Sequence, residues 1–263
     1  MIRGVLLDLA GVLYLGNAVL PGAVEAIRRL RDSGLPVRFV TNTTRTAKAG
    51  VVERLHGMGF TISASELFTP AEAARTWLLA RDATPHLLVH PNLVGDFAGL
   101  EGGSRSAVVV GDAGHAFTYE TLNTAFRALM DGAAFLALAK NRYFMDSDDA
   151  LSLDAGAFVE ALEYASGQPA IVLGKPAPDF YAAAVVALGC DAADVVMVGD
   201  DVEADVSGAL KTGIGKALLV RTGKYRPGAE ADADPSPTAI VDDIGAAADW
   251  ILAERGQVDS KPR

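Results

Sequence analysis

The chain has a single cysteine among its 263 residues, so it cannot form an intramolecular disulfide. That scarcity is typical of proteins that fold in a reducing compartment. No apolar run approaches the about 20 residues that a membrane-spanning helix needs. The segment after Met1 lacks the length and the cleavage site of a signal peptide. We therefore expect a cytoplasmic protein that contacts no membrane.

Positive charge is also scarce. The sequence has 23 lysine and arginine residues against 33 aspartate and glutamate residues, a formal net charge of −10. An acidic surface without a basic cluster repels nucleic acid and anionic lipid, so neither is an expected partner. A phosphorylated small molecule would need a local positive group or a metal ion to bind.

Half of the residues are hydrophobic, which is enough for a core of ordinary size. Short β-branched or leucine-rich segments alternate with segments of helical periodicity. The expected strands are 5–9, 37–41, 86–89, 107–110, 135–138, 170–173, 195–198 and 217–220. The expected helices are 23–31, 47–58, 71–81, 119–131, 155–165, 180–188, 202–212 and 244–254. This alternation predicts an α/β fold with a mainly parallel sheet whose strands are buried on both faces.

Four polar segments each lie at or just beyond the end of a predicted strand. They are Asp8; Thr41 with Asn42; Lys175; and Asp200 and Asp201 with Asp205. In open parallel sheets ligands bind outside the carboxyl ends of the strands, so these are positions where chemistry is expected. Taken singly, each segment could be a turn, a solvated lysine or the acidic start of a helix. Their order and shared position favour one common site.

Together the four segments supply the groups that phosphoryl transfer requires. A carboxylate can act as nucleophile, a hydroxyl and an amide can donate to phosphoryl oxygens, and a lysine can balance charge. The acidic group offers the hard oxygen ligands that a divalent cation prefers. The sequence therefore predicts an enzyme that transfers a phosphoryl group from a small substrate.

The ordered set resembles the haloacid dehalogenase superfamily. That family has an Asp-x-Asp-Gly motif, a strand-terminal Thr or Ser, a Lys, and a Gly-Asp-x-x-x-Asp type run. This chain has Asp8-Leu9-Ala10-Gly11 at the first motif, and the resemblance covers essentially the whole sequence. It implies a Rossmann-like core and a Mg²⁺-dependent phosphatase that works through an aspartyl-phosphate.

The resemblance also implies a role for each acidic residue. Asp8 is the nucleophile and a ligand of Mg²⁺. The backbone carbonyl of Ala10 and the carboxylate of Asp200 are the other metal ligands. Asp205 and Asp201 would orient the water ligands of the metal from outside the first coordination shell.

Three further residues are expected to contact the phosphoryl group. By the same resemblance, Thr41 and the Asn42 amide hold phosphoryl oxygens. Lys175 balances charge between the nucleophile and the phosphoryl group. By contrast, the loop Thr222-Gly223-Lys224-Tyr225 follows the strand after the acidic motif, and we expect it to be structural.

The spacing of the motifs predicts an inserted domain. The interval between Thr41 and Lys175 is far longer than one helix and one strand need, whereas the interval before Thr41 is too short for a domain. We expect a core at 1–75 and 169–263 and an α/β cap domain at 76–168. This arrangement resembles subfamily IIA, whose cap covers the active site. Relatives with this cap often dimerise through it. The resemblance therefore leaves the choice between a monomer and a homodimer open.

Ala10 departs from the family pattern, because it stands where the second aspartate acts as general acid and base. Loss of such a group costs about 10²- to 10⁴-fold in rate. We therefore expect a preference for good leaving groups, as in pyrophosphate, phosphoramidates and aryl phosphates. Two alternatives stay open: a catalytically weakened phosphate- or metabolite-binding pseudophosphatase, and a receiver-like domain phosphorylated on Asp8. The long insertion argues against the receiver, which needs no lid.

Overall fold

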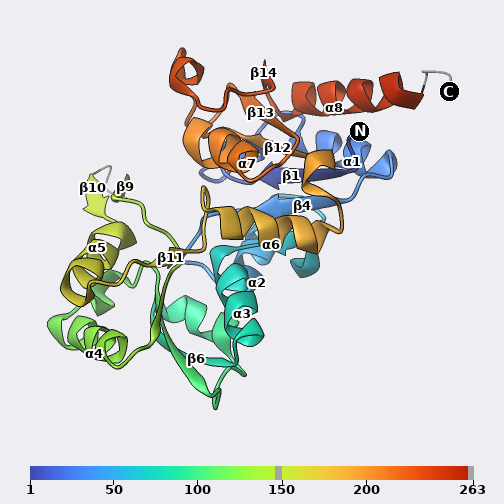
Figure 1. Ribbon diagram of the computed structural model, residues 1–263. Helices are drawn as coiled ribbons and strands as arrows, with labels where there is room; N and C mark the ends of the chain where they lie inside the picture. The colour runs from blue at the N-terminus through green and yellow to red at the C-terminus, as the bar shows by residue number, and fades with distance from the viewer. Residues whose placement is uncertain (146–149, 260–263) are drawn as a thin grey trace. The chain divides into compact units, whose positions relative to one another are not determined.

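The computed structural model describes residues 1–145 and 150–259, which form two compact units (Figure 1). The first unit comprises residues 1–41, 52–68 and 175–263, and the second comprises 42–51 and 69–174. Each unit has its own parallel sheet. The predicted cap at 76–168 falls within the second unit, and its function as a lid stays a prediction.

Six parallel strands form the sheet of the first unit, in the order β14-β13-β12-β1-β4-β5. They are β1 (Gly4–Asp8), β4 (Val37–Val40), β5 (Leu67–Phe68), β12 (Val195–Gly199), β13 (Lys216–Val220) and β14 (Ala239–Val241). Every residue of β1 and β12 is buried, as expected for the central strands of a parallel sheet. The predicted Rossmann-like α/β core is confirmed. The edge strands β5 and β14 are too short to show in the sequence pattern.

The direction in which the sheet grows reverses at β1. The strands β4 and β5 extend the sheet on one side of β1, whereas β12, β13 and β14 extend it on the other. Connections from the two neighbouring central strands leave in opposite directions, which opens a crevice at their carboxyl ends. Asp8 ends β1 and Asp200 directly follows β12, so the fold places both residues at this crevice.

Helices cover the sheet of the first unit. They are α1 (Ala23–Asp32), α6 (Pro178–Leu188), α7 (Gly208–Lys211) and α8 (Ile244–Asp259). The helix α1 packs against α8, whereas α6 packs against β4 and α7. In α1 the buried residues Ala23, Ala26, Ile27 and Leu30 recur at helical spacing and form a single apolar face. No helix in the described part of the chain has both the length and the apolar character needed to cross a bilayer.

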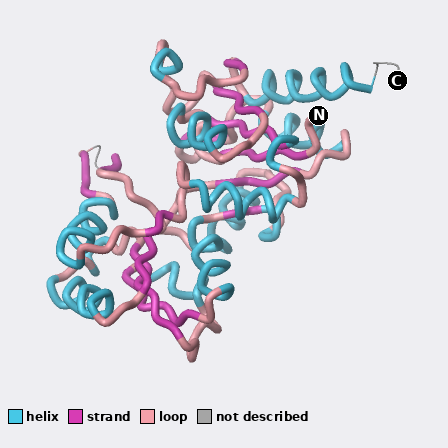
Figure 2. Tube along the Cα trace, in the orientation of Figure 1, coloured by secondary structure: helices cyan, strands magenta, loops and turns pink. Residues whose placement is uncertain are grey.

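The second unit has a four-stranded parallel sheet in the order β11-β8-β7-β6. Its strands are β6 (Ala83–Leu88), β7 (Arg105–Val110), β8 (Ala134–Ala137) and β11 (Ile171–Val172), and its helices are α3 (Pro70–Ala80), α4 (Tyr119–Met130) and α5 (Ala155–Ser166). Val108, Phe135 and Val159 belong to its core, which joins the sheet to α5. Figure 2 shows helix and strand alternating along the chain in both units.

Among the remaining elements are one α-helix, two short hairpins and several 3-10 helices. The helix α2 (Lys48–Gly57) crosses the division between the units. The antiparallel hairpins are β2 (Tyr14–Leu15) with β3 (Ala18–Val19), and β9 (Tyr143–Met145) with β10 (Leu151–Leu153). The first hairpin follows β1 directly and so lies close in sequence to Asp8.

Two elements near the polar motifs differ from the prediction. The strand before Lys175 is β11, which pairs with β8 in the second unit and not with the sheet that carries Asp8. The predicted helix 202–212 begins as a π-helix at Val202–Ser207 and continues as α7. The Asp201 carboxylate accepts hydrogen bonds from the backbone N–H groups of Glu203 and Ala204, in the first turn of this π-helix. Such wide turns are frequent at functional sites.

Candidate active site

Asp8 is the last residue of β1, and only 6% of it is exposed. The Nζ atom of Lys175 donates a hydrogen bond of 2.5 Å to Asp8 Oδ1. No residue in the described ranges donates a hydrogen bond to the other carboxylate oxygen, Oδ2. One oxygen of Asp8 is therefore held in place while the other stays available for a ligand.

Lys175 connects two carboxylates. It donates to Asp8 and, over 2.6 Å, to Asp205 Oδ1. Burial by itself would lower the pKa of Lys175, but the negative charges of Asp205 and Asp8 outweigh that effect and hold the pKa above its ordinary value. The lysine is therefore a fixed positive charge in a buried position.

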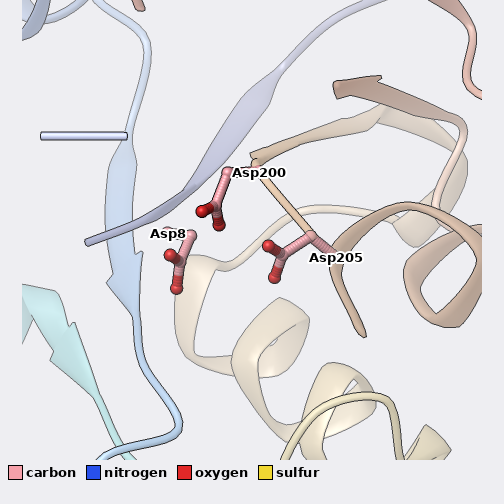
Figure 3. A group of neighbouring side chains, drawn as sticks. All are labelled: Asp8, Asp200 and Asp205. Carbon is pink, nitrogen blue, oxygen red and sulfur yellow. The ribbon is translucent and has the colours of Figure 1, made fainter. Parts of the chain in front are cut away.

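The carboxylates of Asp8, Asp200 and Asp205 lie close together (Figure 3), and one oxygen from each lies within 4.8 Å of the others. Burial raises the pKa of Asp8 to about 7 and the pKa of Asp200 to about 6, and the charge of Asp205 adds to both shifts. The single charge of Lys175 does not balance three ionised carboxylates. A divalent cation fits this donor set, because it prefers carboxylate oxygens and supplies the missing positive charge.

The hydrogen bonds distinguish the three carboxylates. Asp205 uses both oxygens, Oδ1 for Lys175 and Oδ2 for the backbone N–H of Asp201 at 3.2 Å. Asp200 accepts one hydrogen bond from the described residues, at Oδ2 from the backbone N–H of Lys224 over 2.7 Å. Among the described residues, Asp8 and Asp200 thus each keep one oxygen available for a ligand, whereas both oxygens of Asp205 accept hydrogen bonds.

Two glycines allow this close packing. Gly11 has a φ of +87°, and a Cβ atom added there would overlap the carboxylate of Asp200. A Cβ atom at Gly199 would overlap the side chain of Asp205. Only glycine combines the positive φ at position 11 with the absence of a side chain. The glycines of the first and fourth motifs therefore make room for the acidic residues.

Thr41 follows Val40, which pairs with Asp8 in the sheet, so Thr41 lies beside the end of β1. It is buried, and its backbone N–H donates to Phe68 at 3.2 Å. Ala10 has an exposed side chain, which offers no acid or base. Asn42 belongs to the second unit, where its side chain lies beside Gly174. The roles of these three residues stay predictions.

The structure adds residues that the motifs did not indicate. Lys224 donates its backbone N–H to Asp200, and its Nζ lies 3.0 Å from Asp201 Oδ2. The Tyr181 hydroxyl donates a 2.6 Å hydrogen bond to the Ala204 carbonyl, beside Asp205. The sequence signals only a loop at Lys224 and an apolar helix at Tyr181. The pairing of β12 with β13 brings Lys224 to an acidic group 24 residues away.

Models of two related families match the chain. The model described as haloacid dehalogenase-like hydrolase covers residues 5–115, and one described as HAD-hydrolase-like covers residues 172–247. The phospholysine phosphohistidine inorganic pyrophosphate phosphatase of Danio rerio is 44% identical, over 97% of this chain and 96% of its own length. This relative spans both units described above.

Solved structures show the same fold. The 4-nitrophenylphosphatase of Thermotoga maritima aligns with a TM-score of 0.84 and 25% identity, over 95% of this chain and 97% of its own. A glycerol phosphate phosphatase of Mycobacterium tuberculosis, solved in complex with calcium, aligns with a TM-score of 0.80 and 27% identity, over 93% and 74% of the two chains. The predicted resemblance is thus confirmed: the chain belongs to the haloacid dehalogenase-like hydrolases and is a phosphatase of that family.

Proposed function

We propose that this phosphatase depends on Mg²⁺ and hydrolyses a small phosphorylated substrate through an aspartyl-phosphate on Asp8. The observation that carries the proposal is the buried hydrogen bond from Lys175 to Asp8, which leaves one carboxylate oxygen available beside Asp200. A cytoplasmic location and a homodimer, both expected from the sequence, remain predictions.

Asp8 and Asp200 would hold the metal ion, Asp200 through Oδ1, which accepts no hydrogen bond from the described residues. The backbone carbonyl of Ala10 is the third proposed protein ligand. When bound, Mg²⁺ offsets the negative charge of the carboxylates and of the phosphoryl group. The calcium complex of the Mycobacterium tuberculosis relative supports a divalent cation in this family.

The proposed reaction has two steps. In the first, Asp8 Oδ2 attacks phosphorus, a new P–O bond forms, and the bond from phosphorus to the leaving group breaks with the electron pair going to that group. Lys175 holds Asp8 Oδ1 and offsets charge, while Thr41 and Asn42 hold phosphoryl oxygens. In the second, water attacks phosphorus, which releases inorganic phosphate and restores the Asp8 carboxylate.

Ala10 limits which substrates react well. It has no proton to give to a departing alkoxide, so the leaving group must depart as a stable anion or take its proton from solvent. Pyrophosphate, phosphoramidates and aryl phosphates meet this condition. The names of two relatives, a phosphohistidine and inorganic pyrophosphate phosphatase and a 4-nitrophenylphosphatase, support that substrate class.

Replacing Asp8 by asparagine should abolish phosphate release from 4-nitrophenyl phosphate in the presence of Mg²⁺. The amide keeps the size of the carboxylate but is not a nucleophile. Circular dichroism should show a folded protein. Asp242→Asn, which alters an exposed ion pair with Arg221, is the matched control. Wild-type turnover in folded Asp8→Asn would remove the nucleophile assignment, and an inactive wild-type protein would favour the pseudophosphatase alternative.

Chelation by EDTA should stop turnover, and Mg²⁺ should restore it. Asp200→Asn should raise the Mg²⁺ concentration for half-maximal activity at least ~10-fold more than Asp201→Asn does. The reason is that Asp200 has an available oxygen, whereas Asp201 caps the π-helix and pairs with Lys224. Asparagine is also a good N-cap, so Asp201→Asn preserves the helix start. Equal or reversed effects in the titration would contradict the assignment.

Lys175→Met should lower activity by orders of magnitude and should destabilise the fold by about 3–5 kcal/mol at pH 8, because two buried carboxylates lose their partner. The loss should be smaller at pH 5. Burial raises the pKa of Asp8 to about 7, so at pH 5 its carboxyl takes up a proton and one of the two unpaired charges disappears. Urea unfolding at both pH values measures the difference.

The control for this change is Lys216→Met, which removes a partly exposed ion pair with Glu254. Exposed pairs contribute about 0–1 kcal/mol, so this variant should unfold almost as the wild type does. A Lys175→Met protein as stable and as active as the control would mean that Lys175 is an ordinary solvated lysine.

Ala10→Asp should raise kcat/KM for glycerol phosphate by about 10-fold or more, because the new carboxyl can protonate the departing alkoxide. The gain for 4-nitrophenyl phosphate should be smaller, since that leaving group needs no proton. The measurement is kcat/KM for both esters in both proteins. If the wild type hydrolysed both esters equally well, another residue would have to serve as the acid.

A further inference from the structure

The loop that follows β13 contacts both segments that carry the candidate metal ligands. The Oγ1 of Thr222 donates a hydrogen bond to the backbone carbonyl of Gly11, in the turn after Asp8. Two residues later, the backbone N–H of Lys224 donates to Asp200 Oδ2 over 2.7 Å. One short loop, residues 222–224, therefore joins the turn after β1 to the acidic residue after β12.

Gly223, the middle residue of this loop, packs against the carboxylate of Asp200. Gly223 has a φ of +63°, and a Cβ atom added there would overlap the Asp200 carboxylate. That Cβ atom would also lie 2.6 Å from the Cα atom of Gly11. The backbones at Gly11 and Gly223 are therefore in close contact, and the carboxylate lies against both. Because Oδ2 accepts a hydrogen bond and both glycines pack against the carboxylate, rotation of the Asp200 side chain is restricted. The direction of its Oδ1 is therefore restricted as well.

Besides the backbone hydrogen bond from Lys224 to Asp200, two side-chain interactions hold the loop in this position, and they differ in strength. The first is the ion pair between Lys224 Nζ and Asp201, in which the lysine side chain is 74% exposed. Such exposed pairs contribute little, because solvent screens them. The second is the hydrogen bond from the half-buried Thr222 to Gly11, which solvent screens less and which links residues far apart in the chain. The threonine hydroxyl is thus the stronger anchor.

We propose that Thr222 is a positioning residue for the metal site. Its hydroxyl holds loop 222–224 against the turn at Gly11 and thereby orients the Asp200 carboxylate for metal binding. The entropic cost of ordering that carboxylate is then incurred when the protein folds. It therefore does not reduce the affinity for the ion. This inference rests on the proposed function, because it takes Asp200 to be a metal ligand.

Thr222→Val tests the inference, because it replaces the hydroxyl by a methyl group of similar size. Binding of Mn²⁺, followed by the electron paramagnetic resonance signal of the free ion, should weaken by about 10-fold, as for other residues that orient metal ligands. Turnover at saturating Mg²⁺ should stay within about twofold of the wild type. Thr222→Ser, which keeps the hydroxyl, should restore binding.

Thr212→Val is the matched control. The Thr212 hydroxyl donates to the Ala209 carbonyl at 2.6 Å, and this residue is also half-buried in the first unit. Its removal should leave Mn²⁺ binding unchanged. Thr222→Ala, which cannot clash with any neighbour, should reproduce the effect of Thr222→Val and guards against misfolding of the valine variant.

Asp200→Asn separates the two possible failures. If this variant loses Mn²⁺ binding while Thr222→Val and Thr222→Ala bind as the wild type does, the positioning inference is overturned and the proposed metal site stands. If Asp200→Asn binds Mn²⁺ normally, the proposed metal site itself is wrong. Equal loss in Thr222→Val and Thr222→Ser would also overturn the inference, because the hydroxyl would then not be the cause.

Discussion

The hydrogen bonds from buried Lys175 to Asp8 and Asp205 are the interaction on which the site depends. Burying a charge costs several kcal/mol unless a partner of opposite sign is held in good geometry. Each of the three groups is therefore held in place by the others. Asp205 is further fixed by the backbone N–H of Asp201, so the restraint passes from the start of the π-helix to Asp8. The result is a carboxylate with one oxygen held and one available.

The parallel sheet brings the acidic residues of the site together at the carboxyl ends of its two central strands, β1 and β12. Asp8 and Asp200 follow the two central strands, and the side chains meet only because glycines stand at positions 11 and 199. The π-helix after Asp201 then brings Asp205 back to Lys175. Glycines and backbone N–H groups, which carry no reactive side chain, thus shape the site together with the reactive residues.

Ala10 takes no part in this framework. Its side chain is exposed, and the arrangement of Asp8, Lys175 and Asp205 does not involve it. The site can therefore assemble fully while it lacks a side-chain acid at that position. On the proposed mechanism, the departure from the family pattern would therefore affect the range of substrates and the rate, whereas the hydrogen bonds of the cluster do not involve it.

The sequence alone determined the α/β class, the family and the grouping of Asp8, Lys175 and Asp200 in one predicted site. The class and the grouping follow from local periodicity and from polar residues at strand ends, which are properties of neighbouring residues. The family follows from the resemblance of the four ordered motifs. Only the tertiary structure decided that β11 belongs to the second sheet, that 202–207 is a π-helix and that Thr222 contacts Gly11. Thr222 and Gly11 are 211 positions apart, and contacts over such separations depend on how the strands pair, which no local pattern encodes.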